Sequence, residues 1–346
     1  MIGIIGYGNY IPRYRLQLSS IAKMWEKDTM EIVGGLKVQE KSVPYYDEDI
    51  VSMSIEAGRE ALSMAQLHPH EIGALYIGSE SHPYAVNPSS STIGEYLEVG
   101  NSYLAADLEF ACKAGTASMQ LIYSLINSGQ IKYGLAFGAD TAQGKPHDAL
   151  EYTAASAAVC FLLGDDSAKP VALIQSTSSY TSNTPDFWRR DGKKYPSHFG
   201  RFTGEPAYFQ HIVEESKQLL SQSGTKPEDY DYCVFHMPNG KFPRVVAKKL
   251  GFTDAQLAPS LTVDHIGNPY SASSLLGLAA VLDTAKPNQK IFMVSYGSGA
   301  GADGFILQTT KFLQKKRTNH RTVQECIDDK IMISYEQYLR FTHTLS

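Results

Sequence analysis

Short apolar runs alternate with amphipathic stretches along most of the chain. Residues 50–66 carry apolar side chains at helical spacing behind the acidic residues 47–49, which predicts a helix that begins there. Four runs are short and continuously apolar, as expected of strands buried on both faces: 74–77, 135–137, 233–235 and 291–294. Buried strands that alternate with helices predict an α/β fold with right-handed crossovers.

This pattern occurs twice. The segment 69–78, a proline and an acidic turn followed by an apolar run, is matched by 227–236 at an offset of 158 residues. The final strands expected in the two halves, 161–163 and 305–307, are only 144 residues apart. The first half therefore carries about fourteen extra residues, roughly 141–156. An insertion in one copy usually serves a site or an interface.

The two halves are expected to form one compact unit with pseudo-twofold symmetry, because no low-complexity linker divides them. Their predicted extents are 1–165 and 166–310, and residues 311–346 lie outside the repeat. This last segment is expected to be a solvated tail or a docking helix. It begins with a basic patch: Lys311, Lys315, Lys316 and Arg317.

Composition narrows the classes of function. The 346 residues include 31 Lys and Arg against 36 Asp and Glu, with no basic run that would indicate nucleic acid as the main ligand. The N-terminal residues 1–6 are too short and too rich in glycine for a signal peptide or a membrane span. We therefore expect a soluble cytoplasmic protein. The cysteines are far apart, which argues against a disulfide scaffold and a structural zinc site: Cys112, Cys160, Cys233 and Cys326.

Cys112 is the first candidate for chemistry. It lies at the turn between a strand expected to be buried, 105–110, and a helix of very small residues. The positive end of a helix dipole at this point favours thiolate over thiol. The alternative is that Cys112 is an inert packing residue, as most free cysteines are. Cys160 and Cys233 are expected in the core and Cys326 in the tail.

Two strand ends offer partners for this thiol. Glu80 follows the apolar run of the first half, and His236 follows the matching run of the second. Because loops at the carboxyl ends of strands carry the chemistry of α/β sheets, we expect both on pseudo-symmetric sides of one cleft. The offset of 158 places Asn268 opposite Cys112, with its amide free to donate.

The glycine-rich stretch 297–304 precedes a strand rather than a helix, so it is not a dinucleotide-binding loop. A tight hairpin whose backbone N–H groups face a thioester oxygen fits better. Cationic residues that follow His236 offer contacts to polyphosphate, although a solvated helix face is an equal alternative. These are Lys241, Arg244, Lys248 and Lys249, with Arg201 as a further candidate.

Together these residues resemble the thiolase superfamily and, within it, the short archaeal type of 3-hydroxy-3-methylglutaryl-CoA (HMG-CoA) synthases. The resemblance extends over about residues 2–310 and is carried by five stretches: 35–44, 78–88, 109–116, 236–243 and 266–271. It implies a thiolase-like fold of two pseudo-symmetric halves in αβαβα layers. It also implies condensation of acetyl-CoA with acetoacetyl-CoA and water to (S)-HMG-CoA and CoA, in the mevalonate pathway and without a cofactor.

The resemblance further implies roles for individual residues. Cys112 would be acetylated, with the acetyl oxygen held by backbone N–H groups at Cys112 and Ser298. Glu80 would remove a proton from the acetyl methyl group and later protonate the new alkoxide, while His236 and Asn268 would polarise the acetoacetyl carbonyl. The implied acyl contacts are Asp28, Thr29, Thr153, Thr203, Asn268 and Ser298. The expected CoA contacts are Lys241, Arg201 and, from the cationic cluster, Arg244.

Two other functions stay open at this point: a condensing enzyme with a linear β-ketoacyl product, and a non-catalytic scaffold. Glu80 argues against the first, because type III ketoacyl synthases lack it. Glu80, Cys112 and His236 together argue against the second, because a scaffold need not retain all three. A true thiolase would place a second cysteine in 297–304, and none is there. The resemblance implies a homodimer that assembles with an acetoacetyl-CoA thiolase and a small zinc-ribbon/OB-fold protein, to which any metal would belong.

Overall fold

The computed structural model describes residues 1–141 and 144–345, apart from the side chains of Arg201, Phe202 and Asn319. Within this part of the chain, nine strands form one mixed sheet in the order β11-β12-β13-β8-β1-β7-β6-β4-β5. The strands are β1 (Ile2–Tyr10), β4 (Ile72–Gly78), β5 (Leu104–Leu108), β6 (Tyr133–Thr141), β7 (Ser156–Asp165), β8 (Ala172–Thr184), β11 (Tyr232–Phe235), β12 (Lys290–Val294) and β13 (Gly299–Thr309).

The strand order repeats about the middle of this sheet. In the first half, β6 runs parallel to β4 and antiparallel to β7. In the second half, β12 runs parallel to β11 and antiparallel to β13 in the same way. The halves meet through two residue pairs between β1 and β8, Gly3 with Leu173 and Ile4 with Ala172. The predicted α/β fold of two related halves is confirmed.

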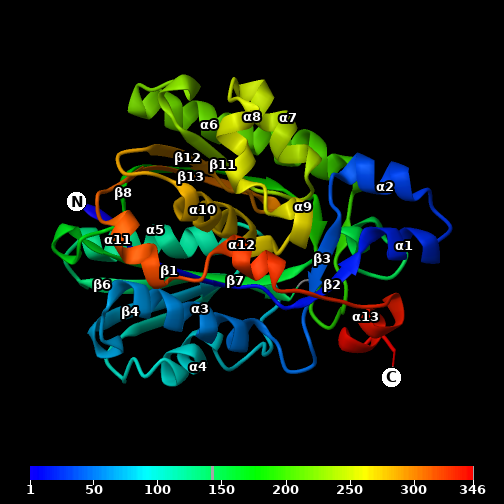
Figure 1. Ribbon diagram of the computed structural model, residues 1–346, viewed down its shortest axis with the longest axis horizontal. Coiled ribbons are helices and arrows are strands. Elements are labelled where there is room, and N and C mark those ends of the chain that lie inside the picture. The colour runs from blue at the N-terminus through cyan, green and yellow to red at the C-terminus, as the bar shows by residue number, and fades with distance from the viewer. Residues whose placement is uncertain (142–143, 346) are drawn as a thin grey trace.

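Figure 1 shows five layers in the molecule. The two halves of the sheet face each other across α5 and α10, with α6, α7 and α8 outside one half and α3 and α4 outside the other. The principal core contains side chains from α5, α10 and both halves of the sheet. The bounds of these helices are α3 (Ile50–Ala65), α4 (Ser89–Tyr96), α5 (Ala114–Asn127), α6 (Phe209–Ser223), α7 (Lys241–Leu250), α8 (Asp254–Leu257) and α10 (Ser273–Thr284).

Small residues allow the two central helices to lie between the layers of strands. A Cβ atom added at Gly115 of α5 would lie 2.7 Å from the carbonyl oxygen of Ser271, just before α10. One added at Gly78, the last residue of β4, would lie 2.1 Å from the carbonyl carbon of Ala114. Helix α10 is buried over most of its length, and most of its side chains are small or apolar.

Two predictions about local structure have different outcomes. The helix predicted to open at residues 47–49 and to run to about residue 66 is confirmed as α3, which begins with a capping box in which Asp49 accepts from the Ser52 N–H at 2.8 Å. The strand predicted over 105–110 to be buried is instead β5, an edge strand paired only with β4. The prediction of burial is wrong, because Ala105 and Glu109 are exposed and the residues between them are only partly buried.

The segment after the repeat docks on the same chain and is not a solvated tail. Its elements are α11 (Leu313–Lys316), α12 (Val323–Asp328), β14 (Ile331–Met332) and α13 (Tyr335–Phe341). Helix α12 packs against α10, and β14 pairs in parallel with β2 (Tyr14–Gln17). Part of the basic patch faces inward: Lys316 donates to the carbonyls of Ile5 and Ala168, at 2.9 and 3.1 Å.

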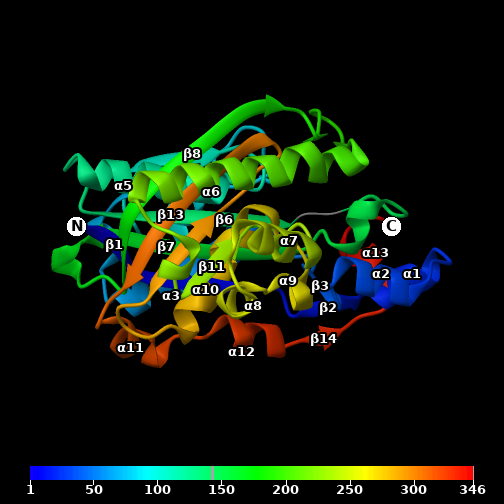
Figure 2. The same ribbon diagram turned by 90° about the horizontal axis from the view of Figure 1, so that it is seen from above.

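The remaining elements surround the end of the molecule where α13 lies (Figure 2). They are α1 (Leu18–Met24), α2 (Thr29–Leu36), β3 (Glu40–Val43), β9 (Phe187–Trp188), β10 (Ser197–His198) and α9 (Val263–Ile266). Strand β2 pairs with β3 on the side away from β14. Within the described residues, no helix combines the length and the apolar character needed to cross a membrane.

The contact between β4 and the start of α5 gives a test of this packing. Gly78→Ala should lower the free energy of unfolding by about 2 kcal/mol or more, since a Cβ atom there meets main-chain atoms that cannot move aside. The control is Gly35→Ala in α2, where an added Cβ has open space within 4 Å and should raise stability by about 0.5–1 kcal/mol. Urea denaturation of both variants measures the difference, and equal effects would contradict the packing described.

Candidate active site

Cys112 and Glu80 are brought into contact by two strand ends. Glu80 lies two residues beyond the end of β4, and Cys112 lies in the tight turn between β5 and α5. The turn places Ala111 in the left-handed region, at a φ of +44°, directly before the cysteine. The Cys112 Sγ donates a hydrogen bond to Glu80 Oε1 at 3.1 Å. Only 6% of Cys112 is exposed, so this contact lies away from bulk solvent.

Both acids of this pair are held in their protonated forms near neutral pH. Desolvation, and then the Asp140 carboxylate, raise the pKa of Glu80 to about 8. Desolvation, and then Glu80, raise the pKa of the Cys112 thiol well above its usual value. The prediction of a resting thiolate at the start of α5 is therefore wrong, because burial and the nearby carboxyls outweigh the helix dipole.

Asp140, at the end of β6, joins the strand ends around this pair. It is fully buried, and its Oδ1 accepts hydrogen bonds from Ser79 Oγ, Glu80 N and Ser81 Oγ at 2.7–2.9 Å. Its Oδ2 accepts from the N–H of Ser271 at 2.9 Å. The sequence analysis missed this residue. A carboxylate that directly follows the apolar run 135–139 was the available signal.

Asp186 holds the glycine-rich loop 297–304 by hydrogen bonds, as Asp140 holds the strand ends. It is fully buried and accepts from the Tyr296 hydroxyl at 2.9 Å, Ser298 Oγ at 3.1 Å and the Gly299 N–H at 2.9 Å. A Cβ atom added at Gly297 would lie 2.5 Å from the carbonyl oxygen of Phe110, so the loop packs directly on the Cys112 turn. The predicted residue Ser298 is thereby brought beside that turn.

The predicted Thr203 joins the same group, since its Oγ1 donates to the carbonyl of Asp186 at 3.4 Å. The sequence analysis missed Asp186, which lies in a polar segment without an apolar run to mark a strand end.

His236 directly follows β11 and is 1% exposed. Its main chain is fixed, because its N–H donates to the Val294 carbonyl at 3.1 Å and its carbonyl accepts from the Tyr208 hydroxyl at 2.6 Å. Burial lowers the pKa of the imidazole to about 3, so the ring is neutral. The ring centroid lies 6.2 Å from that of Tyr296, which links His236 to the glycine loop. A neutral imidazole donates through one nitrogen and accepts through the other.

Asn268 is held by the extra loop of the first half, of which residues 142–143 lie outside the described part. Its N–H donates to the Thr153 carbonyl at 2.7 Å, and its carbonyl accepts from the Ala155 N–H at 3.0 Å. Its side-chain oxygen accepts from the Tyr270 N–H at 3.0 Å. The NH₂ group is consequently the part of this amide that can donate to a ligand. Tyr270 and Cys112 belong to one apolar cluster, which places Asn268 near the thiol.

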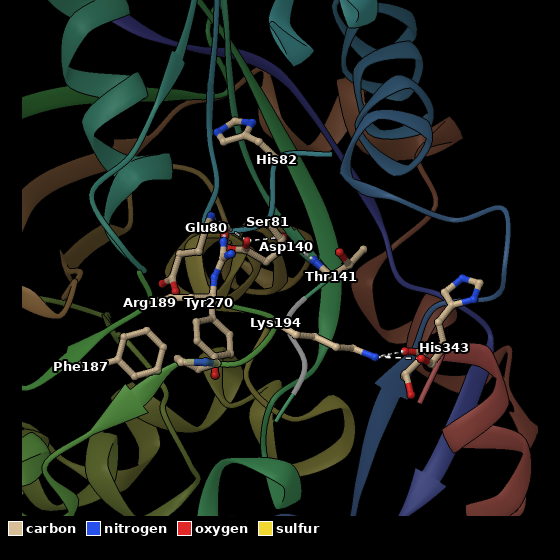
Figure 3. Close-up of a pocket in the computed structure, with 12 residues that line it drawn as sticks. Glu80, Ser81, His82, Asp140, Thr141, Phe187, Arg189, Lys194, Tyr270 and His343 are labelled. Carbon is tan, nitrogen blue, oxygen red and sulfur yellow. Dashed lines mark hydrogen bonds between the residues drawn. The ribbon is translucent and has the colours of Figure 1, made fainter. Parts of the chain in front are cut away.

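A cavity of about 320 Å³ opens beside Glu80. Figure 3 shows Arg189 alongside Glu80, and Arg189 Nη2 donates to the Glu80 carbonyl at 2.8 Å. Several residues that line this cavity were not predicted from the sequence, including Phe187, Arg189, Lys194, Tyr270, Thr342 and His343. Among the described residues that line it, Glu80 is present, but Cys112, His236 and Asn268 are not. Lys194, on the far wall, donates to the carbonyls of Thr342 and His343 at 3.3 and 2.8 Å.

The other predicted contacts lie near α2 and α7, which meet where the Gly240 N–H donates to the Leu36 carbonyl at 2.9 Å. Asp28 caps α2 and is exposed, Thr29 lines a separate groove, and Lys241 is exposed at the start of α7. Arg244 pairs with Asp264 at 2.9 Å, so its charge is compensated within the chain. The side chain of the predicted CoA contact Arg201 lies outside the described residues.

This arrangement supports acyl transfer to a thiol followed by proton transfer. It combines a protonated thiol and carboxyl in contact, a neutral imidazole, a donor amide and a backbone loop packed on the cysteine turn. In the part of the chain that the structure describes, no cluster of three or more His, Cys, Asp or Glu side chains is arranged to hold a metal ion.

Comparisons with known proteins agree with this geometry. Residues 220–309 match the family described as 3-Oxoacyl-[acyl-carrier-protein (ACP)] synthase III C terminal. The chain is 53% identical over 340 residues to hydroxymethylglutaryl-CoA synthase of Archaeoglobus fulgidus, covering 98% of each chain. It is 51% identical over 341 residues to the enzyme of the same name from Methanocaldococcus jannaschii, covering 99% of this chain and 98% of that one.

Solved structures show the same fold. MvaS in complex with 3-hydroxy-3-methylglutaryl coenzyme A has a TM-score of 0.91 at 22% identity, covering all of this chain and 92% of that one. The 3-oxoacyl-[acyl-carrier-protein] synthase III of Aquifex aeolicus has a TM-score of 0.82 at 22% identity, covering 89% of this chain and all of that one. The expected thiolase-like fold is thus confirmed.

The electrostatics of the Cys112–Glu80 pair predict how the thiol reacts. Alkylation of Cys112 by iodoacetamide at pH 7 should be slower than alkylation of an ordinary free thiol, because burial and Glu80 raise the pKa of Cys112. Glu80→Gln should accelerate alkylation more at pH 9 than at pH 6, since the carboxylate that opposes the thiolate is ionised mainly above a pKa of about 8. Mass spectrometry of the labelled peptide gives both rates. The control is the exposed neighbour Glu109→Gln, and an equal acceleration by Glu80→Gln at both pH values would contradict the coupling.

Proposed function

Because the chain belongs to the hydroxymethylglutaryl-CoA synthase family, we propose that it condenses acetyl-CoA with acetoacetyl-CoA and water. The products are (S)-HMG-CoA and CoA, and the step belongs to the mevalonate route to isoprenoids. The single observation that supports this reaction best is the 3.1 Å contact between Cys112 and Glu80. A nucleophile and a base that can reach the same acetyl group are what the reaction requires.

In the first step, acetyl transfers from CoA to Cys112. Loss of one proton from the Cys112–Glu80 pair leaves a single negative charge that the hydrogen bond shares between sulfur and carboxyl. With the charge on sulfur, Sγ attacks the acetyl-CoA carbonyl, and the departing CoA thiolate takes the proton held by Glu80. Acetyl-Cys112 and a Glu80 carboxylate result. The N–H groups of Cys112 and Ser298 are the proposed donors to the thioester oxygen.

In the second step, a carbon–carbon bond forms. The Glu80 carboxylate removes a proton from the acetyl methyl group, and the enolate carbon attacks the ketone of acetoacetyl-CoA. His236, which is neutral, and the NH₂ group of Asn268 donate to that ketone oxygen. Glu80 then returns its proton to the alkoxide. Water hydrolyses the thioester to Cys112, which releases HMG-CoA and restores the thiol.

The binding residues and partners follow from the family. We propose that Lys241 and Arg201 contact CoA, with Arg244 contributing only if its pair with Asp264 opens. Proposed acyl contacts are Asp28, Thr29, Thr153, Thr203, Asn268 and Ser298. We further expect a cytoplasmic homodimer without a resident cofactor, in a complex with an acetoacetyl-CoA thiolase and a small zinc-ribbon/OB-fold protein.

A second candidate is condensation to a linear β-ketoacyl thioester, which the family match over residues 220–309 favours. The two reactions differ in product, since only the proposed one gives a branched 3-hydroxy acid. Chromatography of the acyl-CoA products separates them.

Variants of the reacting pair separate the two steps. Cys112→Ser should form no acetyl-enzyme. Glu80→Gln should be acetylated to full stoichiometry on Cys112, yet its condensation should fall roughly 10²–10⁴-fold because no base remains for the methyl proton. Intact-protein mass spectrometry follows the acetyl group, and chromatography follows HMG-CoA. Normal condensation by Glu80→Gln would place the base elsewhere, and acetylation of Cys112→Ser would refute the nucleophile.

Arg189 should influence the pH at which the Cys112–Glu80 pair loses a proton and can react with acetyl-CoA. Its charge lowers the pKa of Glu80, so Arg189→Met should raise that pKa and move the acid limb of the kcat/KM profile to higher pH. The loss at pH 7 should be roughly fivefold at most, since two charges 4 Å apart in water interact by about 1 kcal/mol. The matched control is the neighbouring exposed Arg190→Met. A profile unmoved in Arg189→Met, or moved equally in the control, would contradict this role.

A further inference from the structure

Glu151, in the loop that the second half lacks, is a fully buried carboxylate that ties three segments together. Its Oε1 accepts from the Tyr335 hydroxyl of α13 at 2.7 Å. Its Oε2 accepts from Trp25 Nε1, just after α1, and from the His147 N–H, both at 2.8 Å. Figures 1 and 2 both show α13 close to α1, and the two helices are in contact. The segment outside the repeat thus reaches the extra loop through a charge-assisted hydrogen bond.

Lys41 of β3 holds the main chain of the same residue. It is 1% exposed, and its Nζ donates to the Glu151 carbonyl at 2.6 Å. The Lys41 Nζ also lies 4.6 Å from the ring centroid of Tyr338, on α13. Lys41 belongs to the stretch 35–44, to which the proposed mechanism gives no role. A buried lysine costs free energy unless its N–H groups find hydrogen-bond acceptors. The Glu151 carbonyl must therefore stay within reach of Lys41, which fixes the position of the loop that carries Glu151.

The loop between these anchors carries both main-chain contacts to Asn268. Thr153 accepts from the Asn268 N–H, and Ala155 donates to its carbonyl. Ser42, next to Lys41, fixes the far end, since its Oγ donates to the Ser156 carbonyl at 2.6 Å. A Cβ atom added at Gly267 would lie 2.7 Å from the Thr153 oxygen, so the two segments have no room to slide past each other.

We propose that Tyr335 and Lys41 are positioning residues for Asn268, acting through Glu151 and the loop that follows it. The proposal rests on the proposed function, in which the Asn268 amide donates to the ketone of acetoacetyl-CoA. The chain after the repeat is thereby part of the machinery for carbon–carbon bond formation. The proposed acetylation of Cys112 does not use the Asn268 amide as a donor to the ketone, so a displaced Asn268 should slow the second step and spare the first.

The first test compares Tyr335→Phe with Tyr45→Phe. The control removes a hydroxyl from a tyrosine that packs on Phe341 of the same helix, and Tyr45 is 37% exposed. Rapid-quench mass spectrometry gives the acetylation rate, and steady-state assays give the condensation rate. Tyr335→Phe should slow condensation about tenfold with acetylation within twofold, because small displacements of a reacting contact are costly. The control should change neither rate.

The second test asks whether the effect passes through Asn268. If it does, adding Tyr335→Phe to Asn268→Ala should cause no further loss of condensation. Multiplied losses, or equal slowing of both steps by Tyr335→Phe, would overturn the proposal. Lys41→Met serves as a second variant if Tyr335→Phe does not fold, and it should show the same pattern. Normal condensation by Asn268→Ala would overturn the positioning role, while wild-type protein that forms no HMG-CoA would overturn the proposed function itself.

Discussion

The rest of the site depends on the hydrogen bond between Cys112 and Glu80, two acidic groups that are both desolvated. Cys112 and Glu80 lie 3.1 Å apart, and a second negative charge on this pair would be opposed by burial and by repulsion. The surroundings reflect this constraint. Asp140 and Asp186 are also buried, and the hydrogen-bond donors that surround their side chains hold the neighbouring loops in place. The pair itself retains the protons that the chemistry moves.

The duplicated fold places candidate residues at matching strand ends in its two halves. The differences between the halves give these residues different chemical properties. Related strands place Glu80 and His236 at matching carboxyl ends, where environment separates their roles: burial holds one as a carboxyl and the other as a neutral imidazole. Two features that have no counterpart in the other half of the fold complete the site. The extra loop holds Asn268, and the segment after the repeat holds that loop through Tyr335.

Much of the fold, and the two segments that bring Cys112 and Glu80 into contact, could be predicted because both depend on short-range patterns. Apolar runs marked the buried strands, and residues directly after those runs, Glu80 and His236, mark the strand ends. Properties that depend on distant packing could not be predicted. The protonation of Cys112 follows from burial and then from carboxyls contributed by other segments, and the exposure of β5 follows from its place at the sheet edge. The two-residue pairing of β14 with β2 is too short to leave a pattern in the sequence.

The central claim is that Glu80 is a protonated partner of Cys112 in the resting protein. The most direct measurement is a ¹³C NMR titration of the Glu80 carboxyl in glutamate-labelled protein, assigned with Glu80→Gln. The account predicts an inflection near pH 8. An inflection near 4.5, the ordinary value for glutamate, would show a carboxylate already ionised beside the thiol and would contradict the account.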